Sequence, residues 1–108
     1  MDLTIIKIGG SLITHKNKKK PAVNFKNLEK IASQFSNLKG KTILIHGAGS
    51  FGHQIVKKTG IDKGIKKEKD LLSFAETQRL QNELNAIFAR AFTKRKIPAI
   101  SYQFSSHA

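Results

Sequence analysis

The residues with the clearest potential for chemistry lie at positions 46–53, where the sequence reads HGAGSFGH. This segment follows an apolar run at 42–45 and precedes a helix-like stretch at 54–58. A strand, a glycine-rich turn and a helix start direct partly positive backbone N–H groups toward one point. Glycine suits such a turn because a side chain would block the close approach of an anion. The pattern therefore predicts a phosphate-binding turn, flanked by His46 and His53.

A second turn of this kind follows residues 3–8, a nearly continuous apolar run that leads into Gly9 and Gly10. In a parallel sheet both turns open at the carboxyl edge of the strands, where ligands of open α/β sheets bind. Two such turns side by side suit a reaction that brings two phosphates together. Lys7 lies in the first apolar run, where a bare ammonium is costly to bury unless it meets an anion. The alternative is that Lys7 is an edge residue that reaches solvent.

The elements that must position these turns alternate along the chain. The predicted order is a strand at 3–8, a helix at about 25–38, a strand at 42–45, a helix at 51–58, a long helix at 70–96 and a strand at 99–102. Both strands before the glycine turns are expected to be buried and parallel. Asn24 and Asp70 are placed to cap helices, and Gly40 fits a helix stop. Segment 14–23 is interpreted as a loop or flexible hairpin, and segment 60–69 is interpreted as a loop. This alternation predicts an α/β layer structure with a parallel sheet.

Both longer helices carry an apolar stripe that is expected to form core. The stripe of the first consists of Phe25, Leu28, Ile31, Ala32 and Phe35. The stripe of the second consists of Leu71, Phe74, Ala75, Leu84, Ile87, Phe88, Ala91 and Phe92.

Composition limits the classes of protein to consider. The 108 residues fit one domain, and the absence of cysteine excludes disulfides and thiolate chemistry, which leaves an intracellular, cytoplasmic location as the expectation. No apolar run approaches the roughly 20 residues of a membrane span. The net charge of +13 suggests nucleic-acid binding, but 17 of the 20 basic residues are lysine, whereas base-edge contacts favour arginine. We therefore favour a solvated lysine-rich surface, or a positive field that attracts small phosphorylated substrates.

The spacing of Gly47, Gly49 and Gly52 also matches the dinucleotide-binding fingerprint. That fingerprint requires an acidic residue about 20 positions later, at the end of the next strand. Here residues 66–70 read KKEKD, which is charged and not strand-like. The fingerprint also belongs to the first strand of its domain, whereas this turn follows the second. The dinucleotide interpretation is therefore the weaker one.

The same residues carry a resemblance to a known family. Residues 7–16 (KIGGSLITHK) resemble the opening of the amino acid kinase superfamily. Residues 46–53 look like the loop of its isopentenyl phosphate kinase branch, and residues 96–101 (KIPAIS) resemble that branch as well. Ala48 stands where the family often has glycine, and its methyl group is tolerated if its φ angle is negative. Fosfomycin kinases, which look similar in this loop, are a rival within the fold.

The resemblance implies a three-layer αβα fold of the carbamate kinase-like type, with parallel central strands. It covers the whole chain but only the N-terminal, phosphate-acceptor portion of the family's domain, so 1–108 are assigned to that portion. The implied reaction is ATP-dependent phosphorylation of isopentenyl phosphate to isopentenyl diphosphate, with Mg²⁺ expected alongside ATP. The sequence has no carboxylate near the glycine turns that could bind this Mg²⁺ ion. The alternative function is a non-catalytic module that binds phosphate or nucleotide.

The resemblance also implies roles for individual residues. Lys7 and His53 would be catalytic, with Lys7 bridging the transferred phosphoryl group and His53 holding the acceptor phosphate. The residues expected to bind ATP are Lys7, Gly9, Gly10, Ser11 and Lys16. The residues expected to bind the acceptor are Gly47, Ala48, Gly49, Gly52 and His53.

The other histidines have plainer interpretations. His46 ends a strand and is expected to be structural, and His15 in a polar loop is expected to be a bystander. Around Phe74 and Gln78 the long helix is a candidate lining for an isoprenoid tail, by analogy with the family. The adenine-binding elements and the ordering aspartate of the family fall outside the matched portion. A C-terminal half chain or a homodimer is therefore the expected partner, and the chain by itself is expected to be inactive.

Overall fold

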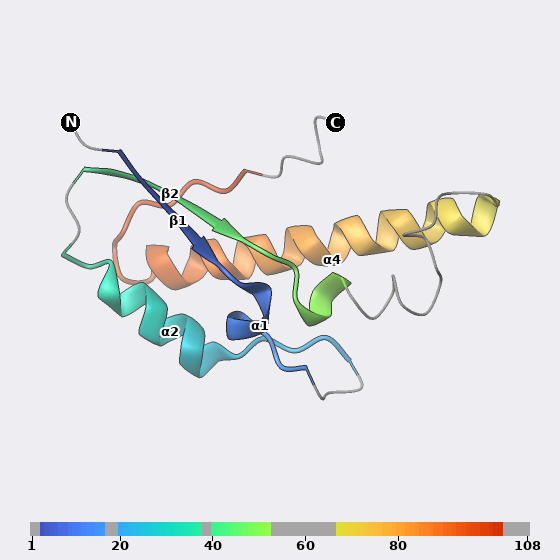
Figure 1. Cartoon of the computed structure of the whole chain (residues 1–108), viewed down its shortest axis with the longest axis horizontal. Helices are drawn as coiled ribbons and strands as arrows, with labels where there is room; N and C mark the ends of the chain where they lie inside the picture. The colour runs from blue at the N-terminus through green and yellow to red at the C-terminus, as the bar shows by residue number, and fades with distance from the viewer. Residues whose placement is uncertain (1–2, 17–19, 38–39, 53–66, 103–108) are drawn as a thin grey trace.

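A computed structural model describes residues 3–16, 20–37, 40–52 and 67–102. Five elements are defined in it (Figure 1): β1 (Leu3–Ile8), α1 (Gly10–Ile13), α2 (Phe25–Gln34), β2 (Lys41–His46) and α4 (Glu68–Thr93). Residues 50–52 are also helical and begin the helix that was predicted after the second glycine turn. The remainder of that predicted helix lies outside the described residues.

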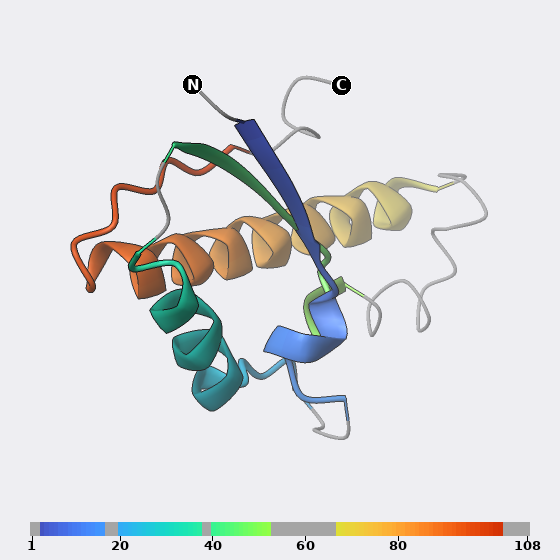
Figure 2. The same ribbon diagram turned by 60° about the vertical axis from the view of Figure 1, so that its left-hand side comes forward.

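Strands β1 and β2 form a parallel pair. Leu3 is opposite Lys41 at one end of the register, and Ile8 is opposite His46 at the other. The predicted parallel pairing is therefore confirmed, and the chain crosses from β1 to β2 through α1 and α2 (Figure 2). Because the strands pair residue by residue over their whole length, both end at the same edge of the sheet. The two glycine turns start there.

The core lies between this sheet and the helices α2 and α4. Strand residues Ile6, Ile8 and Leu44 face the helices, and α4 contributes much of the buried surface. The buried hydrophobic residues are Ile8, Ile13, Leu28, Ala32, Phe51, Leu84, Phe88, Ala91 and Phe92. The aromatic rings of Phe88 and Phe92 lie 5.3 Å apart, and the ring of Phe35 meets that of Phe92 edge-on at 5.6 Å. Burial of these apolar side chains is the main stabilising contribution.

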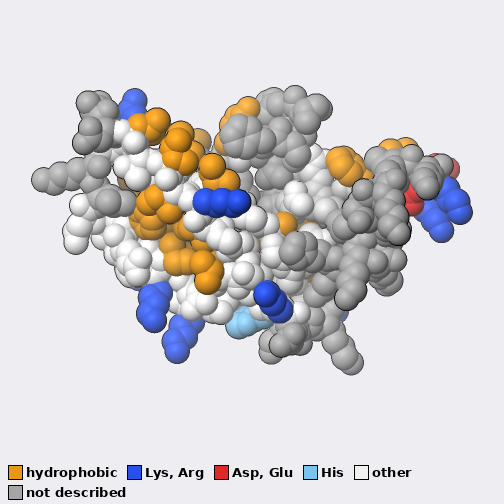
Figure 3. Space-filling view, in the orientation of Figure 1, with side chains coloured by type: hydrophobic (Ala, Val, Ile, Leu, Met, Phe, Trp, Pro, Cys, Tyr) orange, Lys and Arg blue, Asp and Glu red, His pale blue; other side chains and the backbone are white. Residues whose placement is uncertain are grey.

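The opposite face of the sheet is open in the described residues. Leu3 and Ile5 on β1 are 59% and 62% exposed, and Ile43 and Ile45 on β2 are 46% and 42% exposed. Figure 3 shows hydrophobic side chains gathered over this part of the molecule. The prediction that both strands are fully buried is therefore wrong. Alternate residues of a strand point to opposite faces, and helices α2 and α4 cover only one of them.

Helix α2 begins as predicted but ends early. The Asn27 N–H donates to Asn24 Oδ1 at 3.1 Å, so Asn24 is the predicted cap. The helix ends at Gln34, four residues short of the predicted end, and Gly40 has the positive φ of 91° that a helix-terminating glycine can adopt. Phe25 is 60% exposed, so the predicted stripe forms core only from Leu28 onward.

Helix α4 extends beyond the sheet at its N-terminal end (Figure 1). It starts two residues before Asp70, whose Oδ2 accepts from the Lys67 N–H at 3.0 Å and so stabilises the first turn. Leu71 and Phe74 are 56% and 48% exposed. The predicted core stripe is thus wrong for the first half of the helix, because neither the sheet nor α2 reaches it, and correct from Leu84 to Phe92.

The third predicted strand, at residues 99–102, is absent from the described structure. After α4 the chain reverses at Lys96, which has a φ of 60°, and the Ile97 N–H donates to the Phe92 carbonyl at 3.0 Å. Ile97 and Ala99 then pack against the core, while Ile100 is 98% exposed. This segment is therefore anchored by apolar side chains and not by a strand ladder.

Candidate functional site

The two glycine turns meet at the carboxyl edge of the strands, as the sequence predicts. The Gly47 N–H donates to the Ile8 carbonyl at 3.4 Å, which extends the strand pairing into the second turn. Gly10 begins α1 directly after β1, and its backbone nitrogen is 3.3 Å from where a Cβ on Gly47 would stand. The two turns are therefore in backbone contact.

Gly10 has to be glycine because of this contact. A Cβ on Gly10 would lie 2.8 Å from the Gly47 carbonyl carbon and closer still to the Gly49 nitrogen. Real Cβ atoms do not approach backbone so closely, so any side chain would push the turns apart. Gly9 differs, since a Cβ there would meet only Ser11 Oγ, at 3.9 Å.

Gly49 is glycine for two reasons. Its φ of 53° lies in the left-handed region, and a Cβ would lie 2.6 Å from the Gly10 carbonyl oxygen. Packing between the turns thus accounts for glycine at 10 and 49 before any ligand is considered. The phosphate-binding roles of both residues stay predictions.

Thr14 joins the two turns, although it is not among the predicted site residues. The Thr14 hydroxyl donates to the Gly10 carbonyl at 2.8 Å and accepts from the Ser50 N–H at 3.1 Å. Thr14 is only 3% exposed. The available signal was its spacing: a hydroxyl four residues after Gly10 can reach the carbonyl of that residue within a helical turn.

Ser50 presents a second hydroxyl at the same place. The residue is 6% exposed, and its Oγ has no hydrogen-bond partner in the part of the chain that the structure describes. A buried hydroxyl without a partner is unfavourable, so such groups commonly mark a site for a ligand or water. The first N–H groups of the helical segment at 50–52 already have partners, since Ser50 donates to Thr14 and Phe51 donates to the Ala48 carbonyl.

Ala48 fits the second turn without backbone strain. Lys96 is the one non-glycine residue with positive φ in the described ranges, so Ala48 meets the condition stated for tolerance of its methyl group. That methyl group faces Gly52, where an added Cβ would stand 3.1 Å from it. The same position on Gly52 is 3.3 Å from Gln81 Nε2 of α4, so the long helix packs against the second turn.

Three of the predicted ATP-binding residues have exposed side chains: Lys7, Ser11 and Lys16. Lys7 is exposed and pairs in register with Ile45, on the open face of the sheet, so it reaches solvent as the alternative interpretation proposed. Ser11 is exposed on α1. Lys16 is exposed in the hairpin that Thr14 and Val23 close by an antiparallel bridge. His53 lies outside the described residues.

His46 is held on the opposite, helix-covered face. Its ring stacks on Phe88 with centroids 4.7 Å apart, and its Nε2 is 3.0 Å from Asn85 Oδ1. The ring Nδ1 is 3.0 Å from the Gly47 carbonyl oxygen. These contacts support the structural role expected for His46. His15 is exposed, as expected of a bystander.

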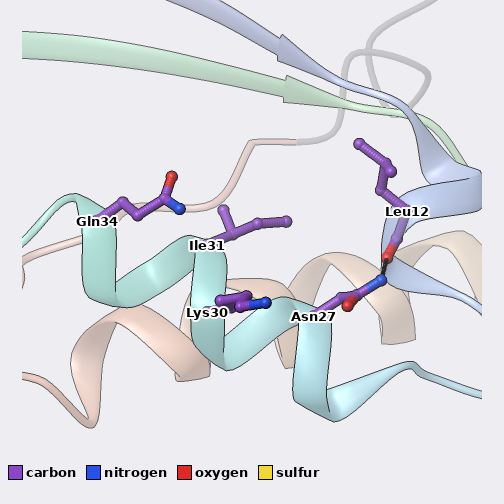
Figure 4. A pocket seen from close by; sticks show the side chains of 5 residues that line it. All are labelled: Leu12, Asn27, Lys30, Ile31 and Gln34. Carbon is purple, nitrogen blue, oxygen red and sulfur yellow. Dashed lines mark hydrogen bonds between the residues drawn. The ribbon is translucent and has the colours of Figure 1, made fainter.

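A separate groove of about 190 Å³ lies between α1 and α2 (Figure 4). Its polar side chains include Asn27, whose amide donates to the Leu12 carbonyl at 2.9 Å. The groove is lined by Leu12, Asn27, Lys30, Ile31 and Gln34. It contains none of the predicted site residues.

Neither a metal-binding cluster nor a membrane-spanning helix occurs in the described ranges. These ranges hold no group of three or more His, Cys, Asp or Glu side chains that could bind a metal ion. The described part of the chain therefore does not fit a protein-held Mg²⁺ site. None of its helices has the length and apolar character needed to cross a bilayer.

Comparison with known proteins identifies the family. Residues 2–107 match the model of the amino acid kinase family. The isopentenyl phosphate kinase of Methanothermobacter thermautotrophicus is 40% identical in an alignment of 109 positions that covers 96% of this chain and 41% of that protein. The isopentenyl phosphate kinase of Methanocaldococcus jannaschii is 37% identical in an alignment of 118 positions that covers 96% of this chain and 44% of that protein. The chain thus spans less than half the length of these curated relatives.

Solved structures agree with these sequence matches. A crystal structure of an isopentenyl phosphate kinase superposes with a TM-score of 0.88 at 39% identity, over 97% of this chain and 45% of that one. The product complex of the Thermoplasma acidophilum isopentenyl phosphate kinase gives a TM-score of 0.76 at 25% identity, over 95% of this chain and 46% of that one. The predicted fold class is confirmed, with the sheet and the helical layer of α2 and α4 supplied by the described residues. The chain belongs to the amino acid kinase family.

Proposed function

We propose that this chain forms the phosphate-acceptor portion of an ATP-dependent kinase that converts isopentenyl phosphate to isopentenyl diphosphate. The observation that carries the proposal is the backbone contact between the two glycine turns, with Gly10 packed on Gly47 and Gly49. The relatives named for this activity match nearly the whole chain, which supports the same conclusion.

The chemistry of the proposed reaction suits two adjacent anion sites. An oxygen of the acceptor phosphate attacks the γ-phosphorus of ATP, the bond from that phosphorus to the β–γ bridging oxygen breaks, and ADP leaves. Catalysis of such a transfer depends on in-line positioning and neutralisation of charge more than on covalent help from the protein. Because the two turns touch, phosphates bound on each would face one another. This arrangement supports direct transfer between them.

The residues that bind ATP, the phosphoryl donor, are proposed to surround the end of β1. Lys7 would neutralise charge on the transferred group, and Lys16 would bind the donor phosphates. The proposed ATP-binding residues are Lys7, Gly9, Gly10, Ser11 and Lys16. Mg²⁺ is proposed to arrive bound to ATP.

The acceptor side is proposed to be the second turn. Gly47, Ala48, Gly49 and Gly52 would bind the acceptor phosphate, and His53 would hold it in line. The buried Ser50 hydroxyl supports this location because it lacks a partner within the described ranges. A phosphate dianion would also favour the charged form of a neighbouring histidine.

The acceptor's hydrocarbon tail is proposed to lie along α4. Phe74, Gln78, Gln81 and Asn85 follow one another at intervals of three or four residues, so they share a helix face. Gln81 reaches the second turn at Gly52, and Phe74 lies about 10 Å further along the axis, from a rise of 1.5 Å per residue. A short branched tail on a phosphate at the turn would therefore run toward Phe74, which is 48% exposed.

A cytoplasmic location and a partner are also part of this proposal. The cysteine-free sequence supports a reducing compartment. A C-terminal half chain would supply the adenine-binding elements, since the matched relatives extend well beyond the aligned portion, and a second copy of this chain is the alternative partner.

Thermal unfolding with small ligands tests the proposal, since a ligand that binds only the native state raises the melting temperature. Isopentenyl phosphate is expected to raise it, whereas isopentenol, which lacks the phosphate, is not. His53→Ala should abolish the shift, and His15→Ala, which changes an exposed histidine with no predicted role, should keep it. A larger shift with fosfomycin would favour a fosfomycin kinase, and no shift with any phosphorylated ligand would contradict the proposal.

A further inference from the structure

His46 connects helix α4 to a single peptide bond of the second glycine turn. A backbone carbonyl can only accept a hydrogen bond, so the ring Nδ1 that lies 3.0 Å from the Gly47 oxygen must carry the proton and donate. In the neutral ring, Nε2 is then an acceptor, so we assign the Asn85 amide, whose Oδ1 lies 3.0 Å from Nε2, the reversed orientation in which its Nδ2 donates. Stacking on Phe88 fixes the plane of the ring. Three contacts thus determine where the Nδ1 proton points.

This hydrogen bond orients the N–H of the next residue. All described peptide bonds are trans, so the Ala48 N–H points opposite to the Gly47 carbonyl of the same peptide unit. With that carbonyl held by the His46 ring, the Ala48 N–H is directed away from the ring and from the helix-covered face. No group in the described part of the chain accepts a hydrogen bond from it. The amide is therefore available to an external acceptor.

We propose that His46 is a positioning residue, which holds the Gly47–Ala48 peptide so that the Ala48 N–H donates to the acceptor phosphate. The inference rests on the proposed function and assigns to His46 a role beyond stability. If the ring did not bind the carbonyl, the peptide could rotate, because Gly47 has no side chain to restrict it. A flipped peptide would present the carbonyl oxygen, which repels an anion, in place of the N–H.

Two substitutions separate this role from packing. His46→Phe keeps an aromatic ring for Phe88 but removes both hydrogen bonds. His46→Asn loses the stack but retains a donor, since the side-chain amide nitrogen of asparagine occupies about the place of Nδ1. If His46 acts only through packing, phenylalanine should preserve ligand binding better than asparagine. If His46 positions the peptide, asparagine should preserve ligand binding better than phenylalanine.

The test titrates the ¹⁵N-labelled chain with isopentenyl phosphate and follows the Ala48 amide signal by NMR. We expect His46→Phe to weaken binding roughly tenfold, the worth of one hydrogen bond to a charged group. His46→Asn should recover most of that loss even where its melting temperature is lower. Equal affinity of His46→Phe and the wild type, with Phe more stable than Asn, overturns the inference and leaves the proposed function standing. A wild type that shows no response to the ligand overturns the proposed function, and this inference with it.

Discussion

At the scale of single residues, a few backbone contacts hold the candidate site together. Gly10 and Gly49 lie where the chain cannot accommodate a Cβ, and the Thr14 hydroxyl links the turn of Gly10 to the turn of Ser50. The same small volume holds a buried hydroxyl, that of Ser50, with no described partner. Residues that keep the turns together and residues left available to a ligand are therefore close neighbours.

Gly10→Ala is expected to destabilise the chain strongly. The added methyl group would overlap backbone atoms of Gly47 and Gly49, which cannot move without separating the turns. We expect a loss of about 3 kcal/mol in the free energy of unfolding, measured by urea denaturation, at the upper end of the usual cost of overpacking. Gly9→Ala is the matched control, because its Cβ would make only an ordinary contact with Ser11 Oγ and its φ of −64° suits alanine. Equal stability of the two variants would show that the turns do not touch.

Thr14→Val should remove both hydrogen bonds while keeping the shape of the side chain. Both partners are backbone groups, buried at Ser50 and half-buried at Gly10, so we expect a loss of about 2 kcal/mol in the free energy of unfolding. Thr14→Ser retains the hydroxyl and should lose much less. The two variants are compared by urea denaturation, and a valine variant as stable as the serine variant would contradict the linking role of Thr14.

Ser50→Ala is expected to behave in the opposite way. Its hydroxyl has no partner among the described residues, so removing it should leave the free energy of unfolding unchanged or slightly higher. The same variant should bind isopentenyl phosphate less tightly than the wild type, by the thermal shift described above. A stability loss as large as that of Thr14→Val would mean that the hydroxyl has a protein partner.

At the scale of elements, α4 serves two purposes. Its second half, from Leu84 to Phe92, packs in the core, and Asn85 in this half contacts His46. Gln81, one turn earlier, lies against the second glycine turn at Gly52. The first half of α4 projects past the sheet and exposes apolar side chains. Polar pairs on the exposed surface help to stabilise this projecting part. Arg79 donates from Nε to Glu76 Oε2 at 2.9 Å, and its Nη1 donates to Glu83 Oε2 at 3.3 Å.

The Glu76–Arg79 pair gives α4 a predictable pH dependence. Hydrogen bonding from Arg79 lowers the pKa of Glu76 below its ordinary value of 4.5. A carboxyl group whose pKa is lower in the folded state stabilises that state above the unfolded value, and the contribution is lost as pH falls through the folded pKa. The contribution is small because the pair is exposed.

Arg79→Ala should therefore raise the pKa of Glu76 toward 4.5, measured by an NMR titration of its side-chain carboxyl. Arg90→Ala, which removes another exposed arginine of the same helix, is the control and should leave that pKa where it was. A Glu76 pKa that is the same in all three proteins would show that the pair does not form.

The elements also show where sequence reasoning succeeds and where it fails. Strand β1 and the turn after it are predictable because an apolar run followed by two glycines has few local alternatives. The Asn24 cap is predictable for the same reason, since its partner is three residues away. The contact of Thr14 with Ser50 spans 36 residues, and no local pattern reports it. The exposure of Phe74 depends on how far the sheet extends, which periodicity along the helix does not reveal.

At the scale of the whole molecule, one face of the sheet is covered and the other is open. Helices α2 and α4 cover the side of Ile6, Ile8 and Leu44, and Glu29 of α2 reaches the end of α4 through Lys94 at 3.7 Å and Arg95 at 3.5 Å. Lys7 lies on the open side, at the edge where the glycine turns meet. The meeting of the two glycine turns was predictable because parallel strands share one carboxyl edge. The lack of a strand at residues 99–102 was not predictable from the sequence, because strand formation requires a neighbouring strand with free backbone groups.

The central claim is that the paired glycine turns form the site for the acceptor phosphate. A crystal structure of the chain with isopentenyl phosphate bound tests it most directly. We expect the phosphate within about 3 Å of the backbone nitrogens of the second turn, Ala48 among them, the usual distance of such hydrogen bonds. The hydrocarbon tail is expected to point along α4 toward Phe74. A phosphate bound away from both turns, with Gly10 still packed on Gly49, would contradict the account.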